Sequence, residues 1–175
     1  MPLILLRHTR PRIDPGICYG RSDLDLDDGF EDALAAILAA LPPVAAVATS
    51  PLSRCRRLAA RIAGARSLPL AEDPRLAEMD FGAWEGRAWT ELPRPELDAW
   101  AADFLHARPH GGETVAELAD RVAAALAELD PDGPAVLWVS HSGVARAACA
   151  TLRRPPLWDT RLDFGAWLEL APPRR

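Results

Sequence analysis

The chain alternates short apolar runs with longer stretches in which apolar residues recur every three or four positions. Short runs bounded by turn-forming residues predict buried β-strands. Helical pattern follows several of these runs, and strands that alternate with helices are typical of a mainly parallel sheet. The predicted strands lie at residues 3–6, 44–49, 67–71, 135–140 and 164–170.

Apolar residues spaced by three or four predict the helices. Thr114 and Glu117 have the spacing of a capping box, in which each side chain accepts from the backbone amide of the other residue. This pair therefore marks the start of a helix. The predicted helices lie at residues 30–41, 53–64, 84–91, 95–105, 114–129 and 143–152.

These elements predict a three-layer α/β domain, with a mainly parallel sheet and helices on both of its faces. The chain has no internal repeat and no linker long enough to separate two domains, so residues 1–175 are expected to form one domain. Residues 72–113 are largely irregular and are expected to form a partial lid. His106 and His110, which flank a proline in this segment, are expected at the surface.

The composition limits the kinds of partner and cofactor that the chain is expected to bind. The net charge of −5 argues against nucleic-acid binding, and no apolar run approaches the roughly 20 residues of a membrane span. All 20 basic residues are arginine, so an arginine by itself indicates little chemistry. Three cysteines without a CxxC pair are typical of reduced thiols in a cytoplasmic protein. Neither a metal ion nor a cofactor is expected.

Basic and imidazole residues follow three of the predicted strands. Arg7 and His8 follow the first strand, Arg54 comes shortly after the second, and His141 follows the strand at 135–140. Ligands of open parallel sheets bind beyond the carboxyl ends of the strands, so these side chains are expected to converge. Neutral imidazole is a nucleophile, and arginine offers paired donors that match phosphate oxygens. The pattern predicts phosphoryl chemistry.

Each of these residues also has a plainer interpretation. A lone histidine after a strand usually faces water, but two histidines and two arginines at neighbouring strand ends favour a functional site. Ser142 opens the helix after the second histidine, and the first amides of a helix can receive an anion. The predicted phosphate-binding residues are Arg7, His8, Arg54, His141 and Ser142.

Five segments resemble the motifs of one family in order and spacing. They are 5–9 (LLRHT), 50–56 (SPLSRCR), 75–86 (RLAEMDFGAWEG), 109–114 (PHGGET) and 139–144 (VSHSGV). The family is the histidine phosphatase superfamily, the phosphoglycerate-mutase-like proteins. The resemblance covers nearly the whole chain and implies the same α/β fold.

The resemblance implies a role for each candidate catalytic residue. His8 would attack phosphorus, and Arg7, Arg54 and His141 would hold the phosphoryl oxygens. Glu78 would protonate the leaving alkoxide and then deprotonate the hydrolytic water. The choice of Glu78 over its neighbouring carboxylates rests on the resemblance. The implied reaction is metal-independent hydrolysis of a small-molecule phosphomonoester.

Within that family, the segments 15–24 (PGICYGRSDL) and 80–89 (DFGAWEGRAW) are similar to the alpha-ribazole phosphatase group. Members of this group remove a 5′-phosphate during cobalamin biosynthesis. Aromatic residues could form a wall for a planar base, although packing in a local core is the plainer interpretation of each tryptophan. The candidate substrate contacts are Tyr19, Arg21, Trp84 and Trp100.

Three other functions remain open. The first is phosphoryl transfer of the phosphoglycerate mutase type, and the second is a phosphatase that acts broadly on sugar phosphates or phosphoproteins. The third is a non-catalytic module that binds phosphate ligands. The complete catalytic set argues against the third, and the short chain favours hydrolysis over transfer.

Two residues depart from the family pattern. Thr9 stands where glycine is usual, and Asp14 stands near a position where many members have an asparagine that contacts phosphate. Because a carboxylate repels phosphate, either the loop shifts the alignment or Asp14 turns away onto Arg10, Arg12 or Arg21.

Overall fold

The computed structural model describes residues 3–155 and 157–171 and contains a five-stranded sheet. The strand order is β3-β2-β4-β1-β5, and only the edge strand β5 runs antiparallel to its neighbour. The predicted mainly parallel sheet is confirmed. The strands are β1 Leu3–Arg7, β2 Ala46–Thr49, β3 Leu70–Glu72, β4 Val136–Ser140 and β5 Trp167–Leu170.

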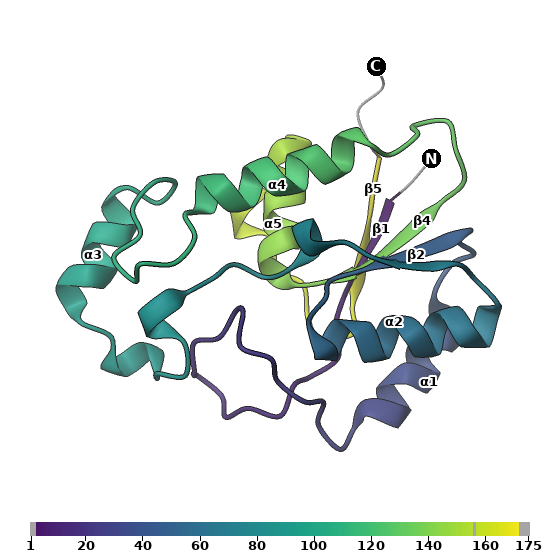
Figure 1. Cartoon of the computed structure of the whole chain (residues 1–175), viewed down its shortest axis with the longest axis horizontal. Helices are drawn as coiled ribbons and strands as arrows, with labels where there is room; N and C mark the ends of the chain where they lie inside the picture. The colour runs from purple at the N-terminus through teal and green to yellow at the C-terminus, as the bar shows by residue number, and fades with distance from the viewer. Residues whose placement is uncertain (1–2, 156, 172–175) are drawn as a thin grey trace.

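Helices cover both faces of the sheet, as Figure 1 shows. The α-helices are α1 Phe30–Ala40, α2 Ser53–Arg66, α3 Arg94–Ala102, α4 Val115–Ala127 and α5 Ser142–Thr151. The pair α1 and α2 covers one face, and the pair α4 and α5 covers the other. Thr114 and Glu117 form the predicted capping box at the start of α4. The predicted three-layer arrangement is therefore confirmed.

The alternating side chains of β1 contribute to two separate cores. Leu3 and Leu5 pack in the core beneath α4 and α5, while Ile4 and Leu6 pack in the core beneath α1 and α2. None of the four is more than 2% exposed. A parallel strand between two helical layers is buried on both faces, which explains the continuous apolar run in the sequence.

The chain between β3 and α4 contains α3 and the 3-10 turns Pro74–Leu76, Gly82–Trp84 and Trp89–Glu91. Pro74–Leu76 lies against α4, and the residues that follow it extend into a lobe at one end of the molecule (Figure 1). The predicted helix over 84–91 is wrong, because Gly86 has a φ of 79° and separates two of these turns. The helix predicted over 95–105 is confirmed but ends earlier.

The lobe has a small aromatic core of its own. Trp84 is fully buried, and its ring meets those of Trp89, Trp100 and His110 edge-to-face. His110 is only 2% exposed, so its predicted surface position is wrong, whereas His106 is exposed as predicted. The aromatic rings against His110, those of Trp84 and Trp100, lie well before it in the sequence.

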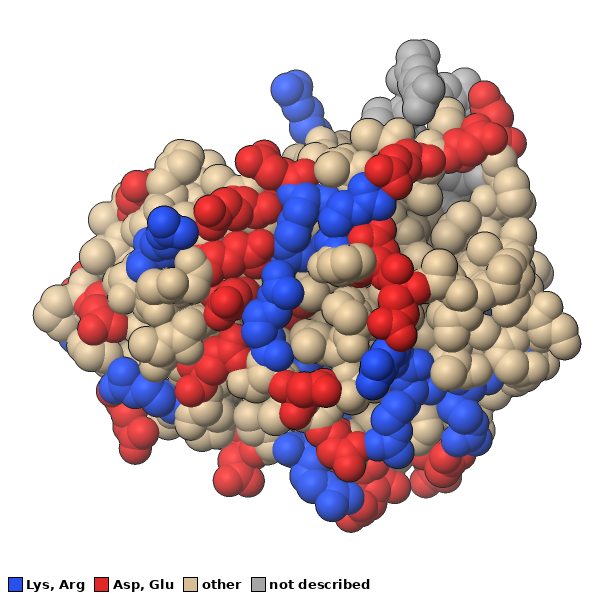
Figure 2. All heavy atoms as spheres, viewed as in Figure 1, with Lys and Arg blue, Asp and Glu red and all other residues tan. Residues whose placement is uncertain are grey.

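Acidic and basic side chains are interleaved on the face shown in Figure 2, where a band of arginines is flanked by carboxylates. This mixed surface fits the small negative net charge of the chain. Among the described residues, no helix is both long enough and apolar enough to cross a membrane.

Candidate active site

The carboxyl ends of β1, β2 and β4 meet at one edge of the sheet. β1 and β4 end in register at Arg7 and Ser140, and Thr49 ends β2 beside β4. His8 and His141 follow directly, and their ring centroids are 5.1 Å apart. The structure therefore brings the two predicted histidines together where the topology of a parallel sheet places a ligand site.

A hydrogen bond fixes the tautomer of His8. Nδ1 lies 2.6 Å from the carbonyl oxygen of Thr9, and because a carbonyl oxygen only accepts, Nδ1 carries the proton. Nε2 consequently holds the lone pair, which accepts the Nε–H of Arg54 at 3.3 Å. The nitrogen available for nucleophilic attack is therefore Nε2.

Both histidines are held in the neutral state. Burial, followed by the charge of Arg54, lowers the pKa of His8 from 6.5 to about 3; Arg7 adds to this effect and the Thr9 carbonyl opposes it. Burial also lowers the pKa of His141 well below its ordinary value, with His8 as the next cause. An attacking imidazole must be unprotonated, so His8 meets this requirement at neutral pH.

The first turn of α2 carries Arg54, which is completely buried. Its guanidinium donates to the carbonyl oxygens of Gly20 at 2.6 Å and Ser22 at 2.7 Å, as well as to His8. These contacts use three of its five N–H groups, so two remain for another acceptor. The loop at 20–22 thus holds the cation beside Nε2 of the imidazole.

Two carboxylates that the sequence did not single out hold this loop. Asp23 accepts from the amide and the hydroxyl of Ser53 at the start of α2, each at 2.7 Å. Glu85 accepts from the amides of Arg21 at 2.8 Å and Ser22 at 2.6 Å. Most acidic residues are solvated, and no short-range pattern indicates that Glu85 lies against this loop.

Arg7 is held by the segment that precedes β5. Its NH1 group donates to the carbonyl oxygen of Leu162 at 2.7 Å, and its guanidinium carbon lies 3.8 Å from the ring centroid of Phe164. The ring of Phe164 also lies 5.5 Å from that of His8. Phe164 is far along the chain from both residues, so sequence reasoning missed it.

Glu78 lies in the irregular segment after β3 and faces the N-terminus of α5. Its Oε2 accepts from the amide of Gly143 at 3.1 Å, and its Oε1 accepts from the amide of Met79 at 3.0 Å. A Cβ atom at position 143 would lie 2.1 Å from Oε1. Glycine at this position therefore leaves the space that the carboxylate occupies.

A cavity of about 310 Å³ opens where the strand ends meet the lobe. Arg7, His8, Glu78 and Ser142 all contribute to its wall. The apolar part of the wall consists of aromatic side chains, most of them from the lobe. They are Tyr19, Phe81, Trp89, Trp100, Phe104 and Trp158.

Four predicted site residues are not in the cavity wall. Arg54 and His141 are fully buried and lie against His8. Trp84 and Arg21, predicted as substrate contacts, also lie outside the cavity wall. The surface of Trp84 is used entirely by packing within the lobe, and the side chain of Arg21 is exposed outside the cavity.

The two departures from the family pattern are accommodated in different ways. Thr9 is buried, and its φ is not in the left-handed region, so a side chain fits there without the freedom of glycine. Asp14 lines a separate surface groove. Arg10 and Arg12 pair with other aspartates, and no ion pair of Asp14 occurs among the described residues.

No group of His, Cys, Asp and Glu residues that could hold a metal ion occurs within residues 3–155 and 157–171. Cys18, Cys55 and Cys149 are free and buried. The polar groups at the strand ends are imidazole, guanidinium, carboxylate, hydroxyl and amide groups, which can bind and transfer a phosphoryl group by hydrogen bonding and nucleophilic attack.

The low pKa values of the buried histidines predict acid lability. The pKa of His8 is lowered on folding, so below pH 6.5 the unfolded chain binds a proton that the folded chain does not, and stability falls toward pH 3. Each such histidine contributes a slope of up to about 1.4 kcal/mol per pH unit. We expect urea unfolding of His8→Asn to depend less on pH between 6.5 and 5 than that of the wild type. Equal slopes would contradict the assignment of a lowered pKa.

Comparisons with known proteins agree with this geometry. Residues 3–169 match the family model described as histidine phosphatase superfamily (branch 1). A glucosyl-3-phosphoglycerate phosphatase of Mycolicibacterium vanbaalenii is 34% identical over 191 residues, which cover 97% of this chain and 83% of that protein. An adenosylcobalamin/alpha-ribazole phosphatase of Escherichia coli K12 is 34% identical over 129 residues, which cover 69% of this chain and 64% of that protein.

The solved structure of the alpha-ribazole phosphatase from Shigella flexneri is also similar. It has a TM-score of 0.85 at 29% identity, with 97% of this chain and 89% of that chain covered. The family match spans nearly all of the sequence, and the relatives are named as phosphatases. The chain therefore belongs to the histidine phosphatase superfamily and is a phosphoric monoester hydrolase.

Proposed function

We propose that the protein hydrolyses its substrate through a phosphohistidine formed on Nε2 of His8. The observation that carries this proposal is the neutral imidazole in the cavity wall, with Nδ1 protonated and the lone pair on Nε2. In the first step, Nε2 bonds to phosphorus as the bond from phosphorus to the leaving oxygen breaks. In the second step, water attacks phosphorus, the bond from phosphorus to Nε2 breaks, and inorganic phosphate is released.

The cations around Nε2 stabilise the charge of the transferring group. Arg7 lies in the cavity wall, and Arg54 keeps two N–H groups that the 20–22 loop does not use. His141 and Ser142, at the start of α5, supply further donors to phosphoryl oxygens. Because these groups are fixed by other contacts before substrate binds, little reorganisation accompanies the reaction.

Glu78 is the general acid and base in this proposal. Its carboxyl group protonates the leaving alkoxide in the first step and takes a proton from the attacking water in the second. Support comes from its place in the same cavity wall as His8 and from the two amides that fix its carboxylate.

The proposed substrate is alpha-ribazole 5′-phosphate, within cobalamin biosynthesis. Its planar benzimidazole suits a cavity in which Trp89, Trp100, Phe104 and Trp158 contribute to the wall. The names of the Escherichia coli and Shigella flexneri relatives add support. Residues 72–113, which carry most of these rings, act in this proposal as a partial lid over the bound base.

Glucosyl-3-phosphoglycerate is a second candidate substrate. The Mycolicibacterium relative with this name aligns over 97% of the chain, and the cavity wall includes Arg146. A guanidinium there could pair with the carboxylate of a glycerate, which alpha-ribazole phosphate lacks. Alpha-ribazole 5′-phosphate would thus depend on the aromatic wall, and glucosyl-3-phosphoglycerate on Arg146.

We expect a higher kcat/KM for alpha-ribazole 5′-phosphate than for 3-phosphoglycerate or glucosyl-3-phosphoglycerate, neither of which carries a planar base. A nucleoside monophosphate, which does carry one, is assayed beside them. Stacking a base on an aromatic ring contributes roughly 1–3 kcal/mol, so Trp100→Leu should reduce this preference by about one to two decades. Trp167→Leu is the control, because Trp167 packs against the core beneath α1 and α2. A preference for a glycerate ester would reject the cobalamin assignment and leave the phosphohistidine mechanism intact.

A further inference from the structure

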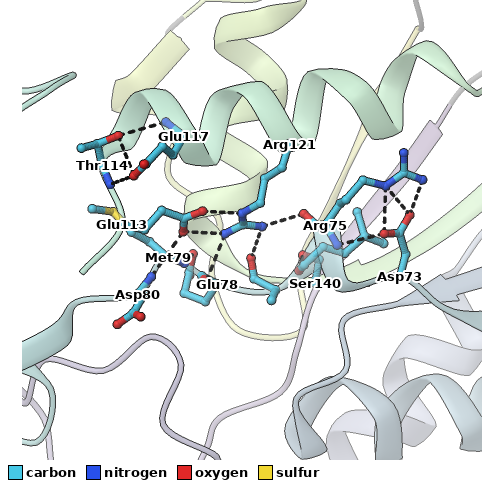
Figure 3. Close-up of polar contacts among 12 residues, drawn as sticks. Asp73, Arg75, Glu78, Met79, Asp80, Glu113, Thr114, Glu117, Arg121 and Ser140 are labelled. Atoms are coloured by element: carbon cyan, nitrogen blue, oxygen red, sulfur yellow. Dashed lines mark hydrogen bonds and ion pairs between the residues drawn. The ribbon is translucent and has the colours of Figure 1, made fainter. Parts of the chain in front are cut away.

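The guanidinium of Arg121, on α4, has all five of its N–H groups matched by protein oxygen atoms (Figure 3). NH1 donates to the carbonyl oxygens of Arg75 at 2.6 Å and Ala77 at 2.7 Å. NH2 donates to the carbonyl oxygen of Glu78 at 3.1 Å and to a carboxylate oxygen of Glu113 at 2.8 Å. Nε donates to the other oxygen of Glu113 at 2.6 Å. Unlike Arg54, this arginine has no donor left for a ligand.

The ion pair between Arg121 and Glu113 is largely withdrawn from solvent, with side-chain exposures of 15% and 12%. Glu113 lies where the lobe returns to α4, and its amide donates to the carbonyl oxygen of Asp80 at 2.9 Å. Arg121 therefore binds the backbone up to Glu78 through its carbonyl groups. Glu113 binds the backbone just after Glu78, at Asp80. Figure 3 shows these contacts converging from α4 on one stretch of backbone.

This stretch of chain, residues 77–81, has no regular secondary structure that would fix it. Buried carbonyl groups need donors, and Arg121 supplies them here in place of a strand or helix. Ser140 at the end of β4 makes one more such contact, from its hydroxyl to the carbonyl oxygen of Leu76 at 2.7 Å. The backbone of Glu78 is thereby tied both to α4 and to the strand that ends at the site.

The carboxylate of Glu78 tolerates little displacement. It sits against Gly143, whose amide it accepts at 3.1 Å, and a single added carbon at that glycine would lie 2.1 Å from Oε1. A shift of the backbone at Glu78 would therefore move the carboxylate relative to Gly143 and change its place in the cavity wall to which His8 also belongs. A misplacement of about 1 Å at a reacting group can cost on the order of 10²-fold in rate.

We infer that Arg121, with Glu113 as its counter-ion, is a positioning residue for Glu78. This inference rests on the proposed role of Glu78 as general acid. Arg121 touches neither the cavity nor His8, so its contribution to the reaction passes through the backbone that carries the acid. Lysine cannot replace it, since a lysine has three donors on a single atom and lacks the planar fork.

The test compares Arg121→Lys with Arg75→Lys. Arg75 is a matched control because, among the described residues, its guanidinium binds the carboxylates of Asp73 and Glu128 and no carbonyl near the acid. Single-turnover phosphorylation is measured with p-nitrophenyl phosphate, whose leaving group needs no proton, and with an alkyl phosphate, whose leaving group does. Rates refer to enzyme that forms phosphohistidine, so unfolded protein does not enter the comparison.

We expect Arg121→Lys to slow the alkyl phosphate by about 10²-fold and p-nitrophenyl phosphate much less, while Arg75→Lys leaves the ratio of the two rates unchanged. Glu113→Gln, which keeps the size of the side chain, should change the ratio in the same direction and decides the matter if Arg121→Lys does not fold. Equal losses on both substrates would show a merely structural role and overturn the inference.

Glu78→Gln separates this inference from the function on which it rests. If Glu78→Gln changes the ratio and the variants of Arg121 and Glu113 do not, only the positioning role fails. If Glu78→Gln leaves the ratio unchanged, the assignment of Glu78 as the acid fails, and the positioning role fails with it. In the double variant Arg121→Lys/Glu78→Gln, the change in ratio should not exceed that of Glu78→Gln alone, because both act on one step.

Discussion

Replacing His8 by asparagine should abolish turnover and leave the fold in place. Loss of a nucleophile costs on the order of 10⁶-fold in kcat in a well-studied covalent enzyme, and an amide cannot attack phosphorus. Asparagine is a better choice than alanine because His8 is only 1% exposed, so a small side chain would leave a void beside Arg54. The side-chain amide of asparagine can also still donate to the carbonyl oxygen of Thr9.

A second measurement, on the wild-type enzyme, identifies the intermediate. Wild-type enzyme quenched during turnover should carry a phosphoryl group that is labile in acid and stable in base, and a peptide that contains His8 should carry it. His106→Asn is the control, since this histidine is exposed and pairs with Asp103 at 3.2 Å; its turnover should match the wild type. Near-wild-type turnover in His8→Asn would end the proposed mechanism.

The convergence of the site could be predicted because it depends on where strands end. Apolar runs that stop at Arg7-His8 and at Ser140-His141 place their following residues at one edge of a parallel sheet, whatever the detail of the loops. The register of β1 with β4 then brings the two imidazoles together. Local pattern and global topology agree at these positions, so the sequence was sufficient there.

The support for the site could not be predicted, because it comes from single contacts between distant segments. The ring of Phe164 stacks on Arg7, and Glu85 holds the loop that binds Arg54. Neither residue carries a local pattern, and a phenylalanine near a strand or a glutamate in a loop has many ordinary explanations. Tertiary packing alone determines these contacts.

Secondary structure in the lobe could not be predicted from local pattern either. Residues 84–91 have helical spacing of apolar residues, but those residues pack against other turns of the lobe rather than form one helical face. Trp84 donates its indole N–H to Glu96 at 2.7 Å, a contact with α3, and Gly86 takes a left-handed conformation that ends the turn. The burial of His110 follows from the same packing.

Replacing Glu78 by glutamine should slow substrates with poor leaving groups far more than those with good ones. General acid catalysis contributes typically about 10²–10⁴-fold, and glutamine keeps the shape of the side chain, but its amide is too weak an acid to protonate the leaving group. Alkyl phosphates, alpha-ribazole 5′-phosphate among them, should lose this factor in the phosphorylation step. Nitrophenolate leaves without a proton, so phosphorylation by p-nitrophenyl phosphate should change little.

Single-turnover rates are the right measurement for this prediction, because Glu78 also acts as the base in the second step and its loss would slow steady-state turnover of every substrate. The control is Glu72→Gln: Glu72 is an exposed residue of β3, its nearest ionic partner is Arg56 at 4.0 Å, and its loss should leave both rates unchanged. Equal phosphorylation losses on both substrates in Glu78→Gln would transfer the acid role to a neighbouring carboxylate. Asp80 would then be the first to test, since it belongs to the same backbone stretch that Glu113 holds.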